Sequence, residues 1–205
     1  MPYAPSDFQQ QFEQQLRGEG ALLSGHFRLS SGLHSDTYVQ CARFLRRPDL
    51  AAPALGVLAK LIQEAGLQPD LVVGPAMGGV VVSYELARQL QVPGIFTERD
   101  ADTKMSLRRG FTLQPGEKVI IAEDVVTTGK STLEVAEVLR QMGVEVLGVA
   151  CLIDRTGGQH ELDFPLFALL PVQAATYQPE NCPLCAKGIP AIKPGSRPDA
   201  VPTLA

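Results

Sequence analysis

The chain has no long apolar run. A helix that spans a bilayer needs roughly 18–20 consecutive apolar residues, and no stretch of the sequence approaches that length. The N-terminal residues Ser6 to Gln10 are polar and do not resemble a signal peptide. We therefore expect a cytoplasmic protein without a membrane partner.

Positive charge and cysteine are also scarce. The sequence carries 18 lysine and arginine residues against 22 aspartate and glutamate residues, for a formal net charge of -4. It lacks the basic footprint of a nucleic-acid-binding protein, so we expect no nucleic-acid partner. Its four cysteines, Cys41, Cys151, Cys182 and Cys185, are too few and too unevenly spaced for the disulfide framework of a small secreted protein.

What the chain does have is enough apolar material for a core. Hydrophobic residues make up 45% of its 205 positions, and neither an internal repeat nor a linker divides it. Helical spacing is seen near the N-terminus, where Phe8, Phe12 and Leu16 recur. The remaining pattern predicts strands at 71–75, 92–96 and 144–153 and helices at 48–65 and 80–90. This alternation is typical of an α/β domain whose mostly parallel sheet is covered on both faces.

The stretch from Val119 to Thr132 carries the strongest chemical signal. An apolar run ends in Glu123 and Asp124, and a loop containing threonine and glycine then opens into a helical pattern. Such a loop places backbone N–H groups at a helix N-terminus, where they can bind a phosphate. Two acids beside an anion site suit a ligand that also carries hydroxyl groups or a divalent metal.

Three other segments are candidates for the same site. A second strand runs into a glycine loop, Gly74 to Gly79, which alone is weak evidence because it does not fit GxGxxG. The charged segment 97–110 is either a solvated surface loop or a mobile arm that brings Arg99 and Lys104 to an anionic substrate. Arg155 follows the strand at 144–153, so it should emerge at the sheet edge that carries the two acids.

Two motif matches are incomplete. Gly129-Lys130-Ser131 matches the end of a P-loop, but the first glycine of that motif would fall on Asp124, whose charge would repel a polyphosphate. Cys182-Pro183-Leu184-Cys185 has the spacing of metal ligands, but one such pair is half of a zinc site. The pair either completes a metal site with a histidine or a second subunit, or consists of ordinary thiols, which is the more frequent case.

The run that ends in two acids, two apolar residues and Thr127-Thr128-Gly129 resembles the phosphoribosyl diphosphate (PRPP) signature of type I phosphoribosyltransferases. Among these enzymes the chain is most similar to the orotate phosphoribosyltransferases. Phe27 to Gly32, with Ser35 and Tyr38, resembles their N-terminal substrate loop. Gly74-Pro75-Ala76 resembles their pyrophosphate loop, Asp154-Arg155 their second orotate contact, and the tail from Cys182 to Ser196 one bacterial branch of the family.

The resemblance implies a fold and an activity. The fold would be the type I phosphoribosyltransferase fold, a single domain over 1–205 with its α/β core at 46–175. A small hood would come from the N-terminal segment 1–45 and the C-terminal extension 176–205. The activity would be Mg²⁺-dependent transfer of 5-phosphoribosyl from PRPP to orotate in pyrimidine biosynthesis, with Mg²⁺ held mainly by PRPP and not directly by the protein. The family also implies a homodimer in which the arm at 97–110 reaches the partner's site.

The same resemblance implies the residues of the site. The PRPP contacts would be Glu123, Asp124, Val125, Val126, Thr127, Thr128, Gly129, Lys130 and Ser131. The pyrophosphate contacts would be Ala76, Met77, Gly78, Gly79, Arg99 and Lys104. Orotate would be bound by Ser31, Gly32, Thr127 and Arg155, and catalysis would depend on Lys104, Arg99 and Asp124.

The chain departs from some family members at two cationic positions. They have lysines where this sequence has Ser30 and Gly78, so more of the positive charge has to come from the arm, which carries Arg99, Lys104, Arg108 and Arg109. The alternatives are a phosphoribosyltransferase for a purine or another base, and a PRPP-binding regulator without catalysis. Arg155 favours a substrate with a carboxylate, and the lack of a basic face argues against the regulator.

Overall fold

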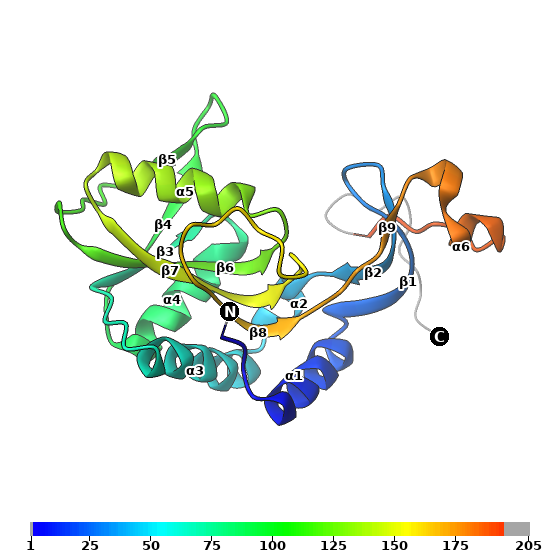
Figure 1. Ribbon diagram of the computed structural model, residues 1–205, viewed down its shortest axis with the longest axis horizontal. Coiled ribbons are helices and arrows are strands. Elements are labelled where there is room, and N and C mark those ends of the chain that lie inside the picture. Colours follow the sequence, from blue (N-terminus) through cyan, green and yellow to red (C-terminus); the bar gives the residue numbers. More distant parts are fainter. Residues whose placement is uncertain (1, 195–205) are drawn as a thin grey trace.

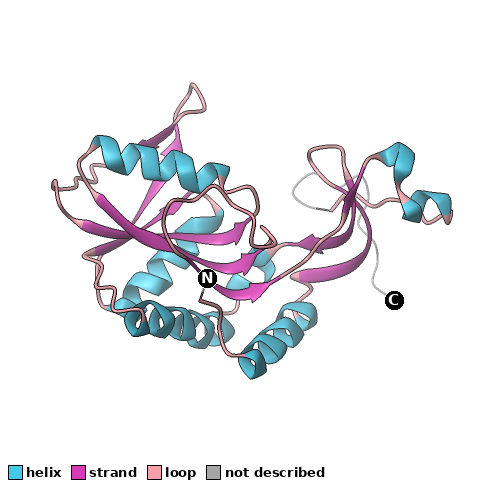
Figure 2. Ribbon diagram, in the orientation of Figure 1, coloured by secondary structure: helices cyan, strands magenta, loops and turns pink. Residues whose placement is uncertain are grey.

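The computed structural model describes residues 2–194, which form two lobes of unequal size (Figure 1). The larger lobe contains a twisted sheet with helices on both faces, and the smaller lobe contains a hairpin and the end of the described chain (Figure 2). None of the described helices has the length and apolar character needed to cross a membrane.

The sheet of the larger lobe has six strands in the order β5-β4-β3-β6-β7-β8. All neighbouring pairs are parallel except β4 and β5, so the predicted, mostly parallel sheet is confirmed. The strands are β3 (Leu71–Pro75), β4 (Gly94–Arg99), β5 (Met105–Leu107), β6 (Lys118–Val126), β7 (Glu145–Asp154) and β8 (Leu166–Pro171).

Alternating side chains of the central strand enter two separate hydrophobic clusters. Ile120 and Ala122 of β6 pack with α1 (Ser6–Gly18), α3 (Pro48–Glu64) and α4 (Gly78–Leu90). Val119 and Ile121 point to the opposite face and pack with α5 (Lys130–Gln141). This two-residue period is the reason why an unbroken apolar strand can lie between two layers of helices.

The smaller lobe joins segments that are far apart in the sequence. The hairpin of β1 (Leu22–Arg28) and β2 (His34–Val39) is extended to a three-stranded sheet by β9 (Thr176–Tyr177), which pairs antiparallel with β2. The 3₁₀-helix η1 (Pro179–Asn181) and α6 (Pro183–Ala186) follow, and Ile192 then returns to pair with Phe27 of β1. The β1–β2 hairpin and the C-terminal extension thus lie together in the smaller lobe (Figure 1), whereas α1 packs on the larger lobe. Residues 195–205 of the extension lie outside the described part of the chain.

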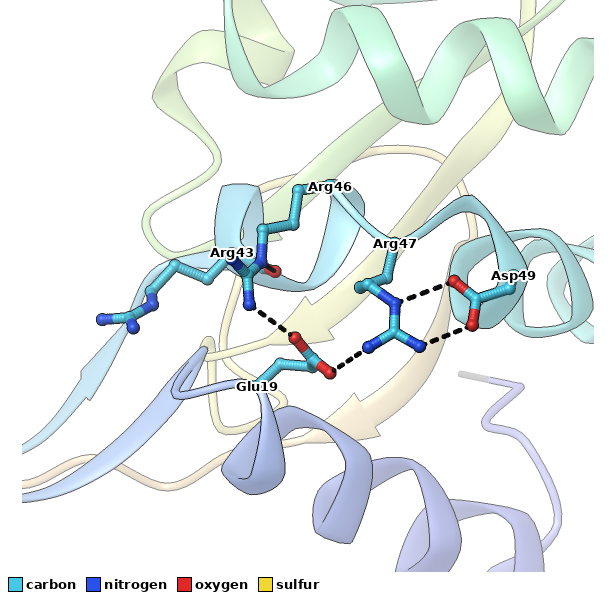
Figure 3. Close-up of polar contacts among 5 residues, drawn as sticks. All are labelled: Glu19, Arg43, Arg46, Arg47 and Asp49. Atoms are coloured by element: carbon cyan, nitrogen blue, oxygen red, sulfur yellow. Dashed lines mark hydrogen bonds and ion pairs between the residues drawn. The ribbon is translucent and has the colours of Figure 1, made fainter.

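A cluster of charged residues joins the end of α1 to the start of α3. Glu19 accepts from Arg46 of the turn after α2 (Cys41–Leu45) at 3.0 Å and from Arg47 at 2.9 Å. Arg47 also binds both carboxylate oxygens of Asp49, whereas the guanidinium of Arg43 points away from Glu19 (Figure 3). Surface pairs of this kind contribute little individually, but together they link the end of α1 to the residues before α3.

Candidate functional site

The carboxyl ends of β3, β6 and β7 meet at one edge of the large sheet. Because these three strands are parallel neighbours, the residues that follow them lie together at this edge: the loop 76–79 after β3, the acids and loop 123–129 at the end of β6, and Arg155 after β7. Open α/β sheets bind ligands in the crevice outside this edge.

The loop between β6 and α5 encloses a cavity of about 250 Å³. Gly129 precedes α5 with φ of +76°, a conformation that favours glycine, and no side chain caps the helix. The first N–H groups of α5 are therefore available to an anion, and the helix dipole adds positive potential there. The cavity is lined by Arg99, Val125, Val126, Thr127, Thr128, Gly129, Lys130, Ser131 and Thr132.

Glu123 and Asp124 lie at the end of β6, with Glu123 beside that loop. Glu123 is 5% exposed, and Ser131 donates a hydrogen bond of 2.7 Å to its Oε1. Burial raises the pKa of Glu123 to about 7, against the lowering effect of the Ser131 hydrogen bond. Burial also raises the pKa of Asp124. Burial of the two acids in their charged form therefore costs free energy in the free protein. Hydrogen bonds from ligand hydroxyls would offset this cost.

The buried Glu123 should make stability depend on pH. The folded protein holds this proton up to a pKa of about 7, against 4.5 for an ordinary glutamate. The folded state therefore binds more protons between these values, so the free energy of unfolding should fall as pH rises through this window, by at most about 3 kcal/mol. Urea unfolding of the wild type and of Glu123→Gln at about pH 5 and about pH 8 should show a smaller loss in the variant. Equal losses in the two proteins would contradict this assignment.

The loop 76–79 packs directly against Asp124. A Cβ atom placed on Gly78 would lie 2.5 Å from Asp124 Oδ1, and one on Gly79 would lie 2.7 Å from the carbonyl oxygen of Ala122. The Ala76–Met77 peptide is cis, and the N–H of Ala76 donates to the carbonyl of Thr97 at 2.7 Å. Gly78 and Gly79 begin α4, so their N–H groups have no acceptor within the helix and are available to a ligand.

Gly78→Ala should therefore disturb Asp124. Helix propensity alone favours alanine here, but the forced contact should cost about 1–3 kcal/mol of stability and raise KM for any ligand that Asp124 contacts. Gly18→Ala is the matched control, because Gly18 also lies at a helix end and a Cβ there would meet nothing within 4 Å. Chemical denaturation and steady-state kinetics on both variants test the contact, and equal behaviour of the two would refute it.

The charged segment 97–110 forms a hairpin of β4 and β5 that lies over α5, as its register and contacts show. Arg99 is paired with Glu134 of α5 and donates to the carbonyl of Thr103. Arg108 and Arg109 are both paired with Glu98. Among residues 2–194, Lys104 takes part in no ion pair, and with Arg99, Thr128 and Lys130 it lines a second, more open cavity of about 780 Å³.

Asp154 and Arg155 have different surroundings despite being adjacent. Asp154 is 1% exposed and accepts from Tyr3 Oη and from the N–H of Thr156, both at 2.7 Å. Burial lowers the pKa of Arg155, against the attraction of Asp36 on β2, and its Nε is buried without a hydrogen-bond partner among residues 2–194. Asp154 is therefore committed to internal hydrogen bonds, whereas Arg155 has a donor left for a ligand. Nothing in the sequence identified Tyr3 as a partner of Asp154.

Ser31 and Gly32 lie at the tip of the β1–β2 hairpin, outside both cavities described above. Gly32 has φ of +86°, and its N–H donates to the carbonyl of Leu29, which closes the turn. The structure thus brings together the loop 127–129, the two acids, the loop 76–79 and Arg155, while the hairpin tip belongs to the smaller lobe (Figure 1).

The comparison with known families agrees with this geometry. Residues 43–180 match the model of the phosphoribosyl transferase domain. This match covers the three strand ends that carry the loop 76–79, the acids with the phosphate loop, and Arg155.

Named relatives share most of the length of the chain. An orotate phosphoribosyltransferase of Desulforamulus reducens is 54% identical over 178 residues, which are 87% of this chain and 92% of the relative. One of Carboxydothermus hydrogenoformans is 51% identical over 177 residues, 86% of this chain and 92% of the relative. The crystal structure of orotate phosphoribosyltransferase from Aeropyrum pernix, 29% identical, superposes with a TM-score of 0.63 over 78% of this chain and 93% of that one.

Proposed function

The chain belongs to the phosphoribosyltransferase family, and from this premise we propose that it transfers the 5-phosphoribosyl group of PRPP to orotate, giving orotidine 5′-phosphate and pyrophosphate. Two relatives that are more than half identical carry that name. The observation in this chain that supports orotate is Arg155, whose guanidinium has an unpartnered buried donor at the edge beside the phosphate loop. A planar two-pronged cation suits the carboxylate of orotate.

We assign the PRPP half of the site to the end of β6 and the start of α5. The N–H groups and hydroxyls of Thr127 to Ser131 hold the 5-phosphate in the cavity that they line. Glu123 and Asp124 accept hydrogen bonds from the ribose hydroxyls, which offsets the cost of burying both acids. The N–H groups at the start of α4 hold the pyrophosphate beside Asp124.

The site suits a substrate that arrives with Mg²⁺, which phosphoribosyltransferases generally use. Mg²⁺ prefers oxygen ligands and commonly binds through substrate phosphates and one or two carboxylates, and here the adjacent carboxylates of Glu123 and Asp124 border the anion loop. The ion would neutralise charge on the pyrophosphate. The cytoplasmic location stays a prediction.

Catalysis by this site rests on positioning and charge. As the bond between ribose C1 and the pyrophosphate oxygen breaks, negative charge gathers on the leaving group and the ribose becomes cation-like. The amides at the start of α4 and a cation from the arm stabilise the leaving group. Thr127 and Arg155 hold the orotate ring so that its nitrogen faces C1. Ser31 and Gly32 complete the orotate pocket when the hood closes over it.

We assign the catalytic cation of the arm to Lys104. Arg99 is paired with Glu134, and Arg108 and Arg109 share Glu98, whereas the ammonium of Lys104 has no anionic partner within residues 2–194. Because Arg99 is held by Glu134, it can act on pyrophosphate only after this ion pair opens. Arg99 also lines the cavity beside the loop 127–129 of its own chain.

A homodimer would allow the arm of each chain to act on the partner's substrate. Support comes from an exposed apolar face at the start of α4, where Met77, which precedes the helix, and Val81 and Tyr84 are 87%, 47% and 70% exposed at helical spacing. Such a patch beside the pyrophosphate loop is typical of a protein contact, and it lies where a partner's arm would have to approach.

The direct test is the reaction itself. Purified protein with PRPP, Mg²⁺ and orotate should consume orotate, measured by the loss of its ultraviolet absorbance, and should release pyrophosphate. Adenine in place of orotate should give no nucleotide, and chelation of Mg²⁺ should stop the reaction. Turnover of adenine without turnover of orotate would refute the proposal, and PRPP binding without turnover of any base would indicate a regulator.

A further inference from the structure

Four side chains with metal-binding atoms converge in the hood. They are His26 on β1, His34 at the start of β2, and Cys182 and Cys185 around the start of α6, and their ligand atoms all lie within 4.8 Å of one another. His26, His34 and Cys182 are buried. Residues separated by as many as 159 positions thus present two imidazole nitrogens and two thiols to one point.

The contacts at this point exceed what one imidazole nitrogen can satisfy. Nε2 of His26 lies 2.8 Å from Nδ1 of His34, 3.4 Å from Sγ of Cys182 and 3.8 Å from Sγ of Cys185. A neutral ring nitrogen has either one proton or one lone pair, so hydrogen bonding accounts for one of these three contacts. A cation bound by all four atoms accounts for every one.

The other nitrogen of His26 is already oriented as in a metal ligand. Its Nδ1 lies 2.7 Å from the carbonyl oxygen of Ile189, so in the neutral ring the Nδ1–H donates to this carbonyl. That bond leaves the lone pair of Nε2 directed at the cluster. Metal-binding histidines commonly donate their second N–H to a backbone carbonyl in this way.

We propose that His26, His34, Cys182 and Cys185 bind a structural Zn²⁺ ion. Zinc bonds of about 2.3 Å to sulfur and about 2.0–2.1 Å to nitrogen in a tetrahedron place sulfur and nitrogen ligands about 3.6 Å apart. Three of the sulfur–nitrogen distances here are 3.3, 3.4 and 3.8 Å. The two nitrogens, 2.8 Å apart, need to separate only by about half an ångström.

The donor set separates this site from the Mg²⁺ that accompanies PRPP. Two thiolates and two imidazoles select zinc, whereas Mg²⁺ prefers oxygen ligands. Four protein ligands leave no position open for water or substrate, which is typical of a structural zinc site and not of a catalytic one. Two thiolates also neutralise the charge of Zn²⁺, so the site can be buried.

Zinc would supply stability that the hood cannot obtain from apolar packing. Leu22 and Val39 at the base of the hairpin belong to the larger hydrophobic cluster, but Phe27 and Cys182 farther out belong to neither cluster of the described residues. Small units without a sufficient core commonly depend on a metal. His26 and His34 also flank the turn that carries Ser31 and Gly32, so the ion would hold that turn to the C-terminal extension.

Metal analysis of the purified full-length protein tests the proposal without reference to its activity. Protein from zinc-supplemented cells should contain about one zinc per chain by mass spectrometry, and Cys185→Ser and His34→Asn should reduce this to trace amounts. Cys185 is exposed, so its replacement should leave the larger lobe folded, which circular dichroism checks. His160→Asn and Cys151→Ala are the matched controls, since neither residue belongs to the cluster, and both should keep the zinc.

Cobalt provides a second readout. Addition of Co²⁺ to the metal-free protein should produce the intense visible bands of a tetrahedral site and a thiolate charge-transfer band, and neither should appear in Cys185→Ser. A protein that contains no zinc and gives no cobalt spectrum would overturn the proposal. So would iron in place of zinc, or a Cys182–Cys185 disulfide found in protein purified without oxidants.

The structural role has its own measurement. Removal of zinc should expose the hood to limited proteolysis, with cleavage first between residues 20 and 40 or after residue 175, while the large lobe stays resistant. Added zinc should restore protection in the wild type and not in Cys185→Ser. Cleavage that is unchanged by chelation would show that the ion does not hold the hood together.

Discussion

Lys104→Ala is expected to lower kcat by about 10²–10³, the usual effect of removing one donor that stabilises transition-state charge. KM for PRPP should change less, because the ammonium acts most strongly when charge gathers on the departing pyrophosphate. The prediction rests on Lys104, which takes part in no ion pair among residues 2–194, whereas Arg99, Arg108 and Arg109 each pair with a glutamate. Steady-state kinetics with orotate and PRPP at saturating Mg²⁺ measure both constants.

Arg108→Ala and Arg109→Ala are the matched controls. Both residues lie on the same hairpin and share Glu98 as their partner, so each loss removes one charge from the arm without removing the proposed catalytic cation. Their kcat should fall by less than about tenfold. A wild-type kcat in Lys104→Ala together with a large loss in either control would move the role to that arginine.

Mixing two inactive variants tests whether the arm acts on the partner subunit. Lys104→Ala keeps an intact phosphate loop and Asp124→Asn keeps an intact arm, so a mixed dimer has one complete site if the arm crosses over. Random exchange of equal amounts should restore about a quarter of the wild-type activity. If each arm served its own chain, every site in the mixture would lack either Lys104 or Asp124, and no activity would return.

Arg155→Ala is expected to raise KM for orotate by about 10–100-fold, because it removes a charge-assisted pair worth about 1.5–3 kcal/mol. KM for PRPP should change by less than about threefold. The basis is the buried Nε of Arg155, which has no hydrogen-bond partner within the described residues 2–194, whereas both carboxylate oxygens of the neighbouring Asp154 accept from Tyr3 and Thr156. Varying each substrate at a saturating level of the other separates the two constants.

Arg155→Lys distinguishes charge from shape. Lysine keeps the positive charge but lacks the planar fork, so its KM for orotate should lie between those of the wild type and the alanine variant. An equal rise of KM for orotate and for PRPP in Arg155→Ala would show that the residue holds the sheet edge together and does not bind the carboxylate.

Much of the large lobe could be read from local patterns. The apolar strand before Glu123 and the helical spacing after Ser131 were visible because period and punctuation are properties of neighbouring residues. The observed β6 and α5 follow these bounds closely. The arm at 97–110 was harder to predict, since a run of charges is compatible with a loop or a hairpin. The antiparallel pairing of β5 with β4 shows that it is a hairpin.

The site was predictable only in part, because local patterns do not show which strands are neighbours in the sheet. The acids and the loop 127–129 are contiguous in the sequence. The glycines of the loop 76–79 are visible in the sequence, but the sequence does not show why glycine is needed there. That reason is the carboxylate of Asp124, 2.5 Å from where a Cβ of Gly78 would lie. It depends on two strands being neighbours in the sheet, which no local pattern specifies.

The sequence by itself determined the α/β class, the strand that ends in two acids and a glycine loop, and the family to which the chain belongs, because each is written in short contiguous segments. Tertiary structure alone decided that Asp154 is bound by Tyr3, that Lys104 is left without an ion pair among residues 2–194, and that Cys182 and Cys185 meet His26 and His34. These facts depend on side chains as many as 159 positions apart. Their approach is set by how sheets and lobes pack, and spacing along the chain does not encode it.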